Sequence, residues 1–158
     1  MIVVADTGPV NYLILSGHVA LVHELYGGVL IPTAVHRELL HPGAPLKVRS
    51  WANALPAWAE VRQAAEPWRF ADLGPGEREA ISLALETKAN FVLMDETLGR
   101  KVAVKNNVPV KGTLGILEEA AHRGLVNLPE AVHKLRGTGI FLSDEIVERV
   151  LQRHRDRS

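Results

Sequence analysis

The chain has 158 residues, of which 47% are hydrophobic and 23% charged, a composition typical of folded globular proteins rather than disordered ones. Its 18 lysines and arginines balance 18 aspartates and glutamates, so the overall charge does not indicate nucleic-acid binding, and any such binding needs a local patch. The absence of cysteine excludes disulfide frameworks, thiolate zinc sites and cysteine nucleophiles.

Length and hydropathy predict one soluble domain. A chain of this size usually forms a single domain, which we expect to span residues 1–158. Its apolar runs are far shorter than the roughly 20 residues that cross a bilayer, so we expect no membrane partner. The apolar start at residues 2–5 is interrupted by Asp6 and lacks a preceding basic region, unlike a signal peptide, so the expected location is the cytoplasm.

Short apolar runs rich in β-branched residues alternate with segments whose apolar residues recur every three to four positions. The first half is predicted to contain strand 2–5, helix 10–25 with a break near 16–17, strand 29–31, helix 32–40, helix 46–58 and edge strand 60–62. The second half is predicted to contain helix 77–88, strand 91–94, helix 98–105, strand 108–111, helices 113–123, 129–136 and 143–154, and a frayed end at 153–158. This alternation predicts an α/β fold with a mainly parallel central sheet, and the uniformly apolar strands predict helices on both faces.

Two predicted strands end directly in an aspartate, Asp6 after residues 2–5 and Asp95 after residues 91–94. In an open parallel sheet, ligands bind beyond the carboxyl ends of the strands, so neighbouring strands would place both carboxylates on one rim. Either residue alone is also explained as a turn former or a helix N-cap. Glu38 adds a third acid at the edge of a buried helix face, where a surface glutamate is the alternative.

Glu77 is the fourth candidate acid. It lies on the same stripe as Ala80 and Ile81 of its helix, whereas Glu79 is expected to project away from that stripe. Stabilisation of the helix dipole explains an acid in the first turn, but not why it faces inward. Glu79 and Glu96 remain further candidates for the site, with a solvated exterior position as the favoured interpretation of both.

Charge repulsion indicates what such a cluster requires. Two carboxylates about 5 Å apart repel each other by roughly 3 kcal/mol at an effective dielectric constant near 20. Four of them in one pocket therefore require a cation or the uptake of protons. Because all the candidates are oxygen ligands and no thiolate is present, the sequence favours a hard cation such as Mg²⁺ or Mn²⁺.

Four motifs, in their order along the chain, resemble the PIN-domain family, and in particular a compact prokaryotic branch related to VapC-type toxins. They are Asp6-Thr7 after the first strand, Glu38 in RELL, GPGEREAISLALE and ANFVLMDE. The resemblance covers about residues 1–125 and leaves C-terminal helices at about 126–155. The alanine-rich helix pattern of the family aligns without a gap when Glu77 takes the acid position, with the following alanines and Asp95 in step.

This resemblance implies a three-layer α/β/α sandwich and the hydrolysis of RNA phosphodiester bonds. It also implies a catalytic site for Mg²⁺ or Mn²⁺ formed by Asp6, Glu38, Glu77 and Asp95. The chain departs from many relatives in having Gly8-Pro9 after Asp6-Thr7, where they have Asn or Ser. It also departs in having a glutamate, Glu77, as the third acid in chain order. The first departure would remove a polar group near the site, and the second would shift the metal slightly.

Substrate contacts need further polar groups. Thr7 and Thr113 are placed to hydrogen-bond a ligand carboxylate or a phosphate, although each would also cap a turn. Four cations that follow the second aspartate are candidates for neutralising RNA phosphates, with an ordinary solvated helix face as the alternative. They are Arg100, Lys101, Lys105 and Lys111.

The family relationship further implies a toxin-type ribonuclease restrained by a small antitoxin protein, and homodimerisation through helices beside the site. The candidate apolar faces for a dimer are residues 10–25 and 46–58. One alternative is a PIN-like metal-binding module with little or no catalysis that acts through protein contacts. Another is a receiver-like or phosphatase-like protein with an aspartyl nucleophile, which would require a lysine and a hydroxyl at later strand ends, to which Lys111 and Thr113 loosely correspond.

Overall fold

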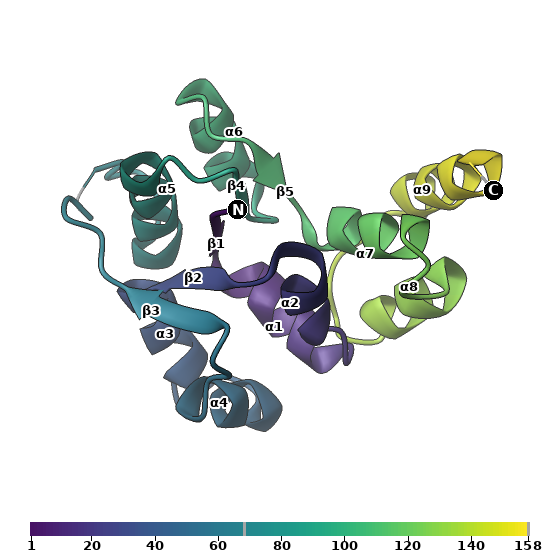
Figure 1. Ribbon diagram of the computed structural model, residues 1–158, viewed down its shortest axis with the longest axis horizontal. Coiled ribbons are helices and arrows are strands. Elements are labelled where there is room, and N and C mark those ends of the chain that lie inside the picture. The colour runs from purple at the N-terminus through teal and green to yellow at the C-terminus, as the bar shows by residue number, and fades with distance from the viewer. Residues whose placement is uncertain (68, 158) are drawn as a thin grey trace.

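The computed structural model describes residues 1–67 and 69–157 of the chain. Within these residues, five strands form one all-parallel sheet in the order β3-β2-β1-β4-β5 (Figure 1). The strands are β1 (Val3–Ala5), β2 (Val29–Pro32), β3 (Ala59–Arg62), β4 (Phe91–Leu93) and β5 (Val110–Lys111). Because β1 is central and pairs directly with β4, the residues that follow these two strands share one edge of the sheet.

The described ranges contain nine helices. They are α1 (Thr7–Leu15), α2 (Ala20–Tyr26), α3 (Thr33–Leu40), α4 (Leu46–Asn53), α5 (Pro75–Thr87), α6 (Thr97–Lys105), α7 (Thr113–His122), α8 (Leu128–Arg136) and α9 (Asp144–Arg157). No helix in the part of the chain that the structure describes is both long enough and apolar enough to cross a bilayer.

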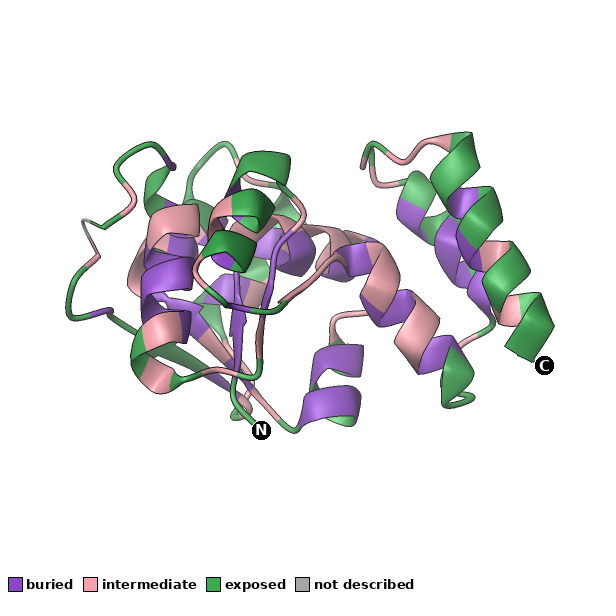
Figure 2. Ribbon diagram, turned by 90° about the horizontal axis from the view of Figure 1, so that it is seen from above, coloured by how far each residue is buried: buried purple, intermediate pink, exposed green. Residues whose placement is uncertain are grey.

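Alternate strand residues supply the two faces of the sheet. Val4 and Val92 pack with the buried residues of α5 and α6, whereas Val3, Ala5 and Leu93 pack with those of α1, α2, α3 and α7. Helices therefore cover both faces, and Figure 2 shows the buried residues of the strands and of α5 inside this arrangement. The predicted α/β/α sandwich with a parallel sheet is confirmed.

Several element boundaries differ from the prediction. Helix α1 begins at Thr7, because Gly8 and Pro9 occupy its first turn, where proline is tolerated. The helix predicted over residues 46–58 ends at Asn53, since Pro56 disfavours helical backbone in the residue before it. The end predicted to fray from residue 153 is helical to Arg157, and Ser158 lies outside the described residues.

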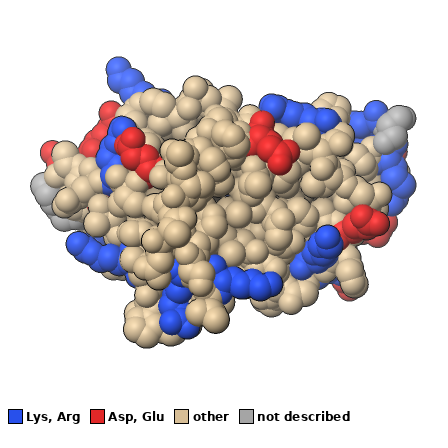
Figure 3. Space-filling model, turned by 60° about the horizontal axis from the view of Figure 1, so that its bottom comes forward, with Lys and Arg blue, Asp and Glu red and all other residues tan. Residues whose placement is uncertain are grey.

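Charged side chains are dispersed over one face of the molecule (Figure 3). On the face shown in Figure 3, lysines and arginines are scattered around a largely uncharged middle. The balanced charge of the chain is thus not divided into one broad basic face and one acidic face in this view. Any attraction for a polyanion on this face must come from a small group of cations.

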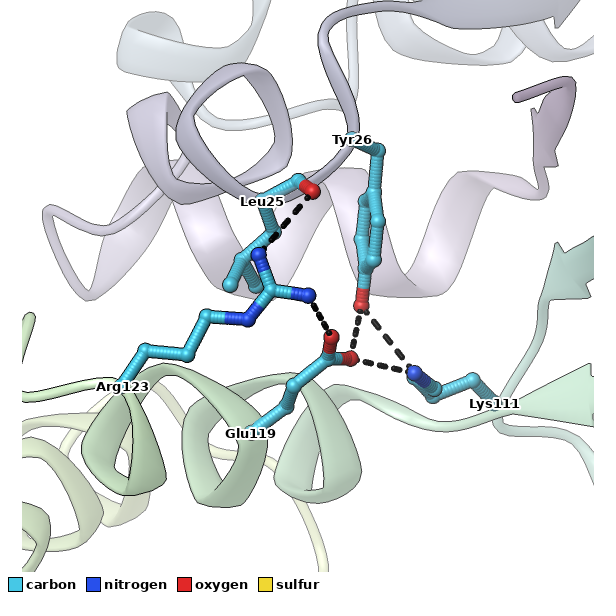
Figure 4. A network of polar contacts seen from close by, with 5 residues as sticks. All are labelled: Leu25, Tyr26, Lys111, Glu119 and Arg123. Carbon is cyan, nitrogen blue, oxygen red and sulfur yellow. Dashed lines mark hydrogen bonds and ion pairs between the residues drawn. The ribbon is translucent and has the colours of Figure 1, made fainter.

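Helices α7, α8 and α9 extend from the β5 edge of the sheet (Figure 1). A polar network fixes the first of them to the sheet (Figure 4). Glu119 of α7 accepts hydrogen bonds from the Tyr26 hydroxyl at 2.7 Å and from the Lys111 ammonium, which also lies 4.6 Å from the centre of the Phe91 ring. Arg123 completes the network with an ion pair to Glu119 at 3.0 Å. Lys111 is therefore held between elements and is not free for a substrate phosphate.

Candidate functional site

Asp6 lies at the centre of the carboxyl-terminal edge of the sheet. Its backbone N–H donates to the Leu93 carbonyl at 2.9 Å and extends the pairing of β1 with β4. It occupies the N-cap position of α1, but its side chain makes no capping hydrogen bond, so the simple N-cap interpretation does not explain the carboxylate. Only 6% of the residue is exposed, and burial, followed by the negative charges of Glu38 and Asp95, raises the pKa of Asp6 to about 7.

Asp95 follows β4 and is bound by the start of α7. Its Oδ1 accepts the backbone N–H of Thr113 at 2.8 Å, and its Oδ2 accepts the Thr113 hydroxyl at 2.6 Å. Thr113 is fully buried, so this pair fixes the carboxylate to the first residue of a helix. The expectation that Thr113 binds a site carboxylate is confirmed.

Glu38 comes from the exposed last turns of α3 and points to the starts of two other helices. Its carboxylate accepts a hydrogen bond from the Thr7 hydroxyl of α1 and another from the Gly76 backbone N–H of α5, the second at 3.1 Å. The expected role of Thr7 as a partner of a site carboxylate is therefore confirmed. These two contacts hold Glu38 beside the end of β1.

Glu77 lies in the first turn of α5, and its Oε2 atom is buried without a hydrogen-bond partner among the described residues. Burial, then the adjacent carboxyl of Glu96, and then the charge of Asp6 raise the pKa of Glu77 to about 7. A buried carboxylate oxygen that lacks a donor is costly, and a cation or a proton would remove that cost.

The structure places the two further candidate glutamates, Glu79 and Glu96, in different surroundings. Glu96 is exposed, as expected, but its carboxylate caps α6 by accepting the Gly99 N–H at 2.8 Å, and this bond lowers its pKa. Glu79 was expected on the exterior, and this prediction is wrong, because only 3% of the residue is exposed. Its carboxylate accepts the backbone N–H groups of Ala34 at 2.7 Å and Ala64 at 3.0 Å.

The error at Glu79 has a physical cause in the surroundings of α5. Residues 79–84 of this helix are all buried, because the sheet covers one side, and α3 and the segment after β3 cover another. A helical wheel that assumes one buried stripe cannot describe such a helix. Glu79 is therefore bound inside the fold and is not part of the acid cluster.

Three glycines pack directly against the candidate acids, and sequence reasoning missed them. A Cβ atom at Gly76 would lie 2.7 Å from both carboxylate oxygens of Glu38. A Cβ at Gly99 would lie 2.9 Å from Oε2 of Glu77, and one at Gly112 would lie 2.9 Å from Oδ1 of Asp95. One sequence feature could have indicated them. Gly76 and Gly99 lie inside helices, where glycine is less favourable than alanine by about 0.5–1 kcal/mol and therefore needs another reason to be present.

The structure brings the four predicted acids into one electrostatic neighbourhood around Asp6. Glu38 and Asp95 act on Asp6, and Asp6 acts on Glu77. In the described ranges, however, no three acid or histidine side chains are already close enough together to hold an ion. The donor set still fits Mg²⁺ or Mn²⁺ in kind, because it consists of carboxylate oxygens and includes a buried oxygen without a partner. Binding of an ion would therefore require these side chains to turn toward one another.

Comparison with known proteins adds one finding. A family model described as a PIN domain matches residues 2–156, which is nearly the whole chain. No curated protein and no solved structure gives a match.

Proposed function

The chain belongs to the PIN-domain family, whose members are typically nucleases, and from this premise we propose that it is a metal-dependent ribonuclease that hydrolyses RNA phosphodiester bonds. The observation that carries the proposal is the acid cluster around Asp6, in which two carboxyl groups have pKa values raised to about 7. Burial first, and then the charges of neighbouring acids, disfavour the ionised carboxylates, and a divalent cation bound at this edge of the sheet offsets both effects. We also propose that residues 1–158 form one domain, which the extent of the family match supports.

In this proposal Asp6 and Asp95 are the primary ligands of Mg²⁺ or Mn²⁺, and Glu38 and Glu77 bind directly or through water. When bound, the ion supplies Lewis-acid polarisation of the phosphate and a lowered pKa for water in the site. Thr113 holds the Asp95 carboxylate in place through its hydroxyl and N–H groups. With pKa values raised to about 7, Asp6 and Glu77 are partly protonated near neutral pH in the metal-free protein, and binding of the cation favours their ionised forms.

Cations of α6 are the nearest candidates for contacts with RNA at this edge. The Arg100 guanidinium donates to the Met94 carbonyl at 3.2 Å, and a Cβ at Gly112 would touch both this group and Asp95. Arg100 is thus fixed beside a proposed metal ligand. Lys101 and Lys105 are exposed on the same helix and are available for phosphates.

The test is cleavage of a varied RNA pool by the parent protein and by Asp6→Asn, with Mg²⁺, with Mn²⁺ and with a chelator. We expect the parent to cleave only with metal, and Asp6→Asn to lose at least about 100-fold in rate, because a primary ligand is removed. Asp72→Asn is the matched control, since Asp72 is an exposed acid outside the cluster. Cleavage that survives chelation, or equal rates for Asp6→Asn and the parent, would contradict the proposal.

We further propose that the nuclease acts in the cytoplasm as the toxin of a toxin–antitoxin pair, restrained by a small antitoxin protein, and forms a homodimer. The VapC-like motifs support this assignment. The apolar faces of residues 10–25 and 46–58 pack mainly inside the chain, but Leu46 remains 69% exposed and is available for a dimer contact. Copurification with the product of an adjacent small reading frame, and the mass of the purified protein in solution, test both statements.

A second candidate is a metal-binding module that acts through protein contacts with little catalysis, because carboxylates can bind an ion without being arranged for catalysis. In the described ranges, no three side chains already form a metal-binding group. Calorimetric binding of Mn²⁺ without cleavage of any RNA in the pool would support this candidate over the nuclease. The aspartyl-phosphate alternative has less support, because Lys111 is bound to Glu119 and the Thr113 hydroxyl is bound to Asp95.

A further inference from the structure

A hollow of about 290 Å³ lies beside the acid cluster, where the starts of α3 and α5 meet the segment after β3. Two arginines line it, Arg37 from α3 and Arg78 from α5. Each is the chain neighbour of a proposed metal ligand, since Arg37 precedes Glu38 and Arg78 follows Glu77. Glu38 also accepts the N–H of Gly76, the residue after Pro75 of the lining, so this acid lies next to the hollow.

No hydrogen bond or ion pair joins either guanidinium of this hollow to the residues that the structure describes. Among the described residues, neither Arg37 nor Arg78 makes a side-chain hydrogen bond or an ion pair, although Glu79 lines the same hollow. Glu79 does not pair with them because its two oxygens already accept the N–H groups of Ala34 and Ala64. The hollow thus presents two unpaired positive charges over one carboxylate that is already hydrogen-bonded.

The remaining lining supplies neutral donors. Thr33 and Gln63 also line the hollow, and their side chains make no hydrogen bond to the described part of the chain. Two planar guanidinium groups with hydroxyl and amide donors match the oxygens of a phosphate diester, which guanidinium binds in a bidentate manner. The net charge of the lining, two positive groups and one negative, fits a singly charged anion.

We propose that this hollow binds a backbone phosphate of the RNA substrate adjacent to the scissile phosphate, held by Arg37 and Arg78. The proposal rests on the ribonuclease function, because the scissile phosphate must lie at the acids. The RNA strand then passes from the acid cluster over the contact of α3 with α5. Substrates too short to reach the hollow lose this contact, so the enzyme favours longer strands.

Binding of a labelled single-stranded RNA oligonucleotide, measured by fluorescence anisotropy with a chelator present, tests the hollow without catalysis. We expect Arg37→Gln/Arg78→Gln to bind at least about 10-fold more weakly than the parent. We also expect the slope of log K against log salt to become shallower by about 0.7, the contribution of one single-strand phosphate contact. The control is Lys47→Gln/Lys88→Gln, which removes the same charge from α4 and from the far end of α5 and should bind within twofold of the parent.

A methylphosphonate scan locates the contact. Replacing one backbone phosphate at a time with a neutral methylphosphonate should weaken binding to the parent at one position beside the cleavage site. The same replacement should have no further effect on Arg37→Gln/Arg78→Gln. If that variant binds RNA as tightly as the lysine control, or responds to the scan as the parent does, the hollow is not a phosphate site.

Different results would overturn the ribonuclease function and the phosphate site. A parent protein that cleaves RNA while the arginine variant binds like the control overturns the phosphate site alone. A parent that does not cleave RNA with either metal overturns the ribonuclease, and with it the adjacent-phosphate site, even where the arginines contribute to RNA affinity. Unchanged thermal unfolding of both double variants confirms that they fold, as expected for side chains without partners.

Discussion

Three glycines leave space for carboxylate oxygens of the site acids, space that a side chain with a Cβ atom would occupy. Gly76, Gly99 and Gly112 each bring bare backbone against a carboxylate oxygen of a different acid. In this arrangement the carboxylates are positioned by steric fit, which is sensitive to a single methyl group. The glycines therefore belong to the machinery that orients the proposed ligands.

Gly76→Ala should separate activity from stability. The three atoms nearest to the added methyl group all belong to the Glu38 carboxyl group, with both oxygens at 2.7 Å, so the carboxylate must move while the helix gains the higher propensity of alanine. We expect cleavage or metal affinity to fall at least about 10-fold with unfolding temperature unchanged or raised. Gly115→Ala is the control, since its methyl group meets Lys111 Cγ at an ordinary 3.4 Å. Equal activity of both variants would show that the Glu38 position does not matter.

Raised pKa values at Asp6 and Glu77 predict how stability depends on pH. Both values are about 7, above the ordinary values of 3.8 and 4.5, so these groups keep protons in the folded state that the unfolded chain has lost. The metal-free protein should therefore lose stability as pH rises from about 4 to 7, with a penalty on the order of 2–4 kcal/mol for Asp6. Urea titrations across this range measure it.

A divalent cation and a substitution should both remove that dependence. Mg²⁺ should raise the unfolding temperature more at pH 8 than at pH 5, because it binds the ionised carboxylates. Asp6→Asn should gain stability over the parent without metal, and this gain should be larger at pH 8 than at pH 5. A parent whose stability is flat between pH 5 and 8 would contradict the raised pKa values.

Helices α3 and α5 cap each other reciprocally. Glu38 of α3 accepts the N–H of Gly76 in the first turn of α5, and Glu79 of α5 accepts the N–H of Ala34 in the first turn of α3. First-turn N–H groups have no partner within their own helix, so each glutamate satisfies a group that would otherwise be orphaned. This exchange fixes the relative position of the two helices that carry Glu38 and Glu77.

Glu79→Gln should destabilise the fold and indirectly weaken the site. The amide keeps one acceptor but places an NH₂ group against a backbone N–H donor, at a cost of about 1–3 kcal/mol. The matched control is Glu86→Gln, because Glu86 accepts the N–H groups of Ala65 and Glu66 from an exposed position. Thermal unfolding of both variants tests this expectation, and an equal loss of stability would refute the buried role of Glu79.

The elements of the fold were predictable where the local pattern decides the structure. Asp6 and Asp95 follow apolar strands, so the sequence located them at the sheet edge. Glu79 was misplaced, because its burial depends on two backbone N–H groups that the chain folds over α5. The helicity of the last residues depends on Arg153, which binds Glu118 of α7 from 35 residues away. Contacts of this range leave no periodic signal in a single sequence.

At the scale of the molecule, α9 is attached through α7 and α8 rather than through the sheet. Val147 and Val150 bury one side of α9, and Arg153 forms two hydrogen bonds with Glu118, at 2.6 and 2.9 Å. These contacts lie far along the chain from the acid cluster. The C-terminal helices therefore support α7, whose first residue holds Asp95.

Arg153→Gln should loosen the end of α9 without affecting the site. Amide hydrogen exchange should become faster in residues 151–157 and stay unchanged in α8, because only the Glu118 contact is lost. High salt should have a similar but smaller effect on the parent, since the Arg153 side chain of this ion pair is about half exposed. Unchanged exchange in α9 would show that the apolar contacts alone hold this helix.

The sheet order β3-β2-β1-β4-β5 brings together proposed ligands from both halves of the chain. Asp6 and Glu38 precede residue 63, whereas Glu77 and Asp95 follow residue 74. A cut in the connection between β3 and α5 would therefore leave two acids on each fragment and a complete site on neither. The proposed nuclease activity would then return only when the two fragments associate. Cleavage of RNA would therefore measure the association of the fragments.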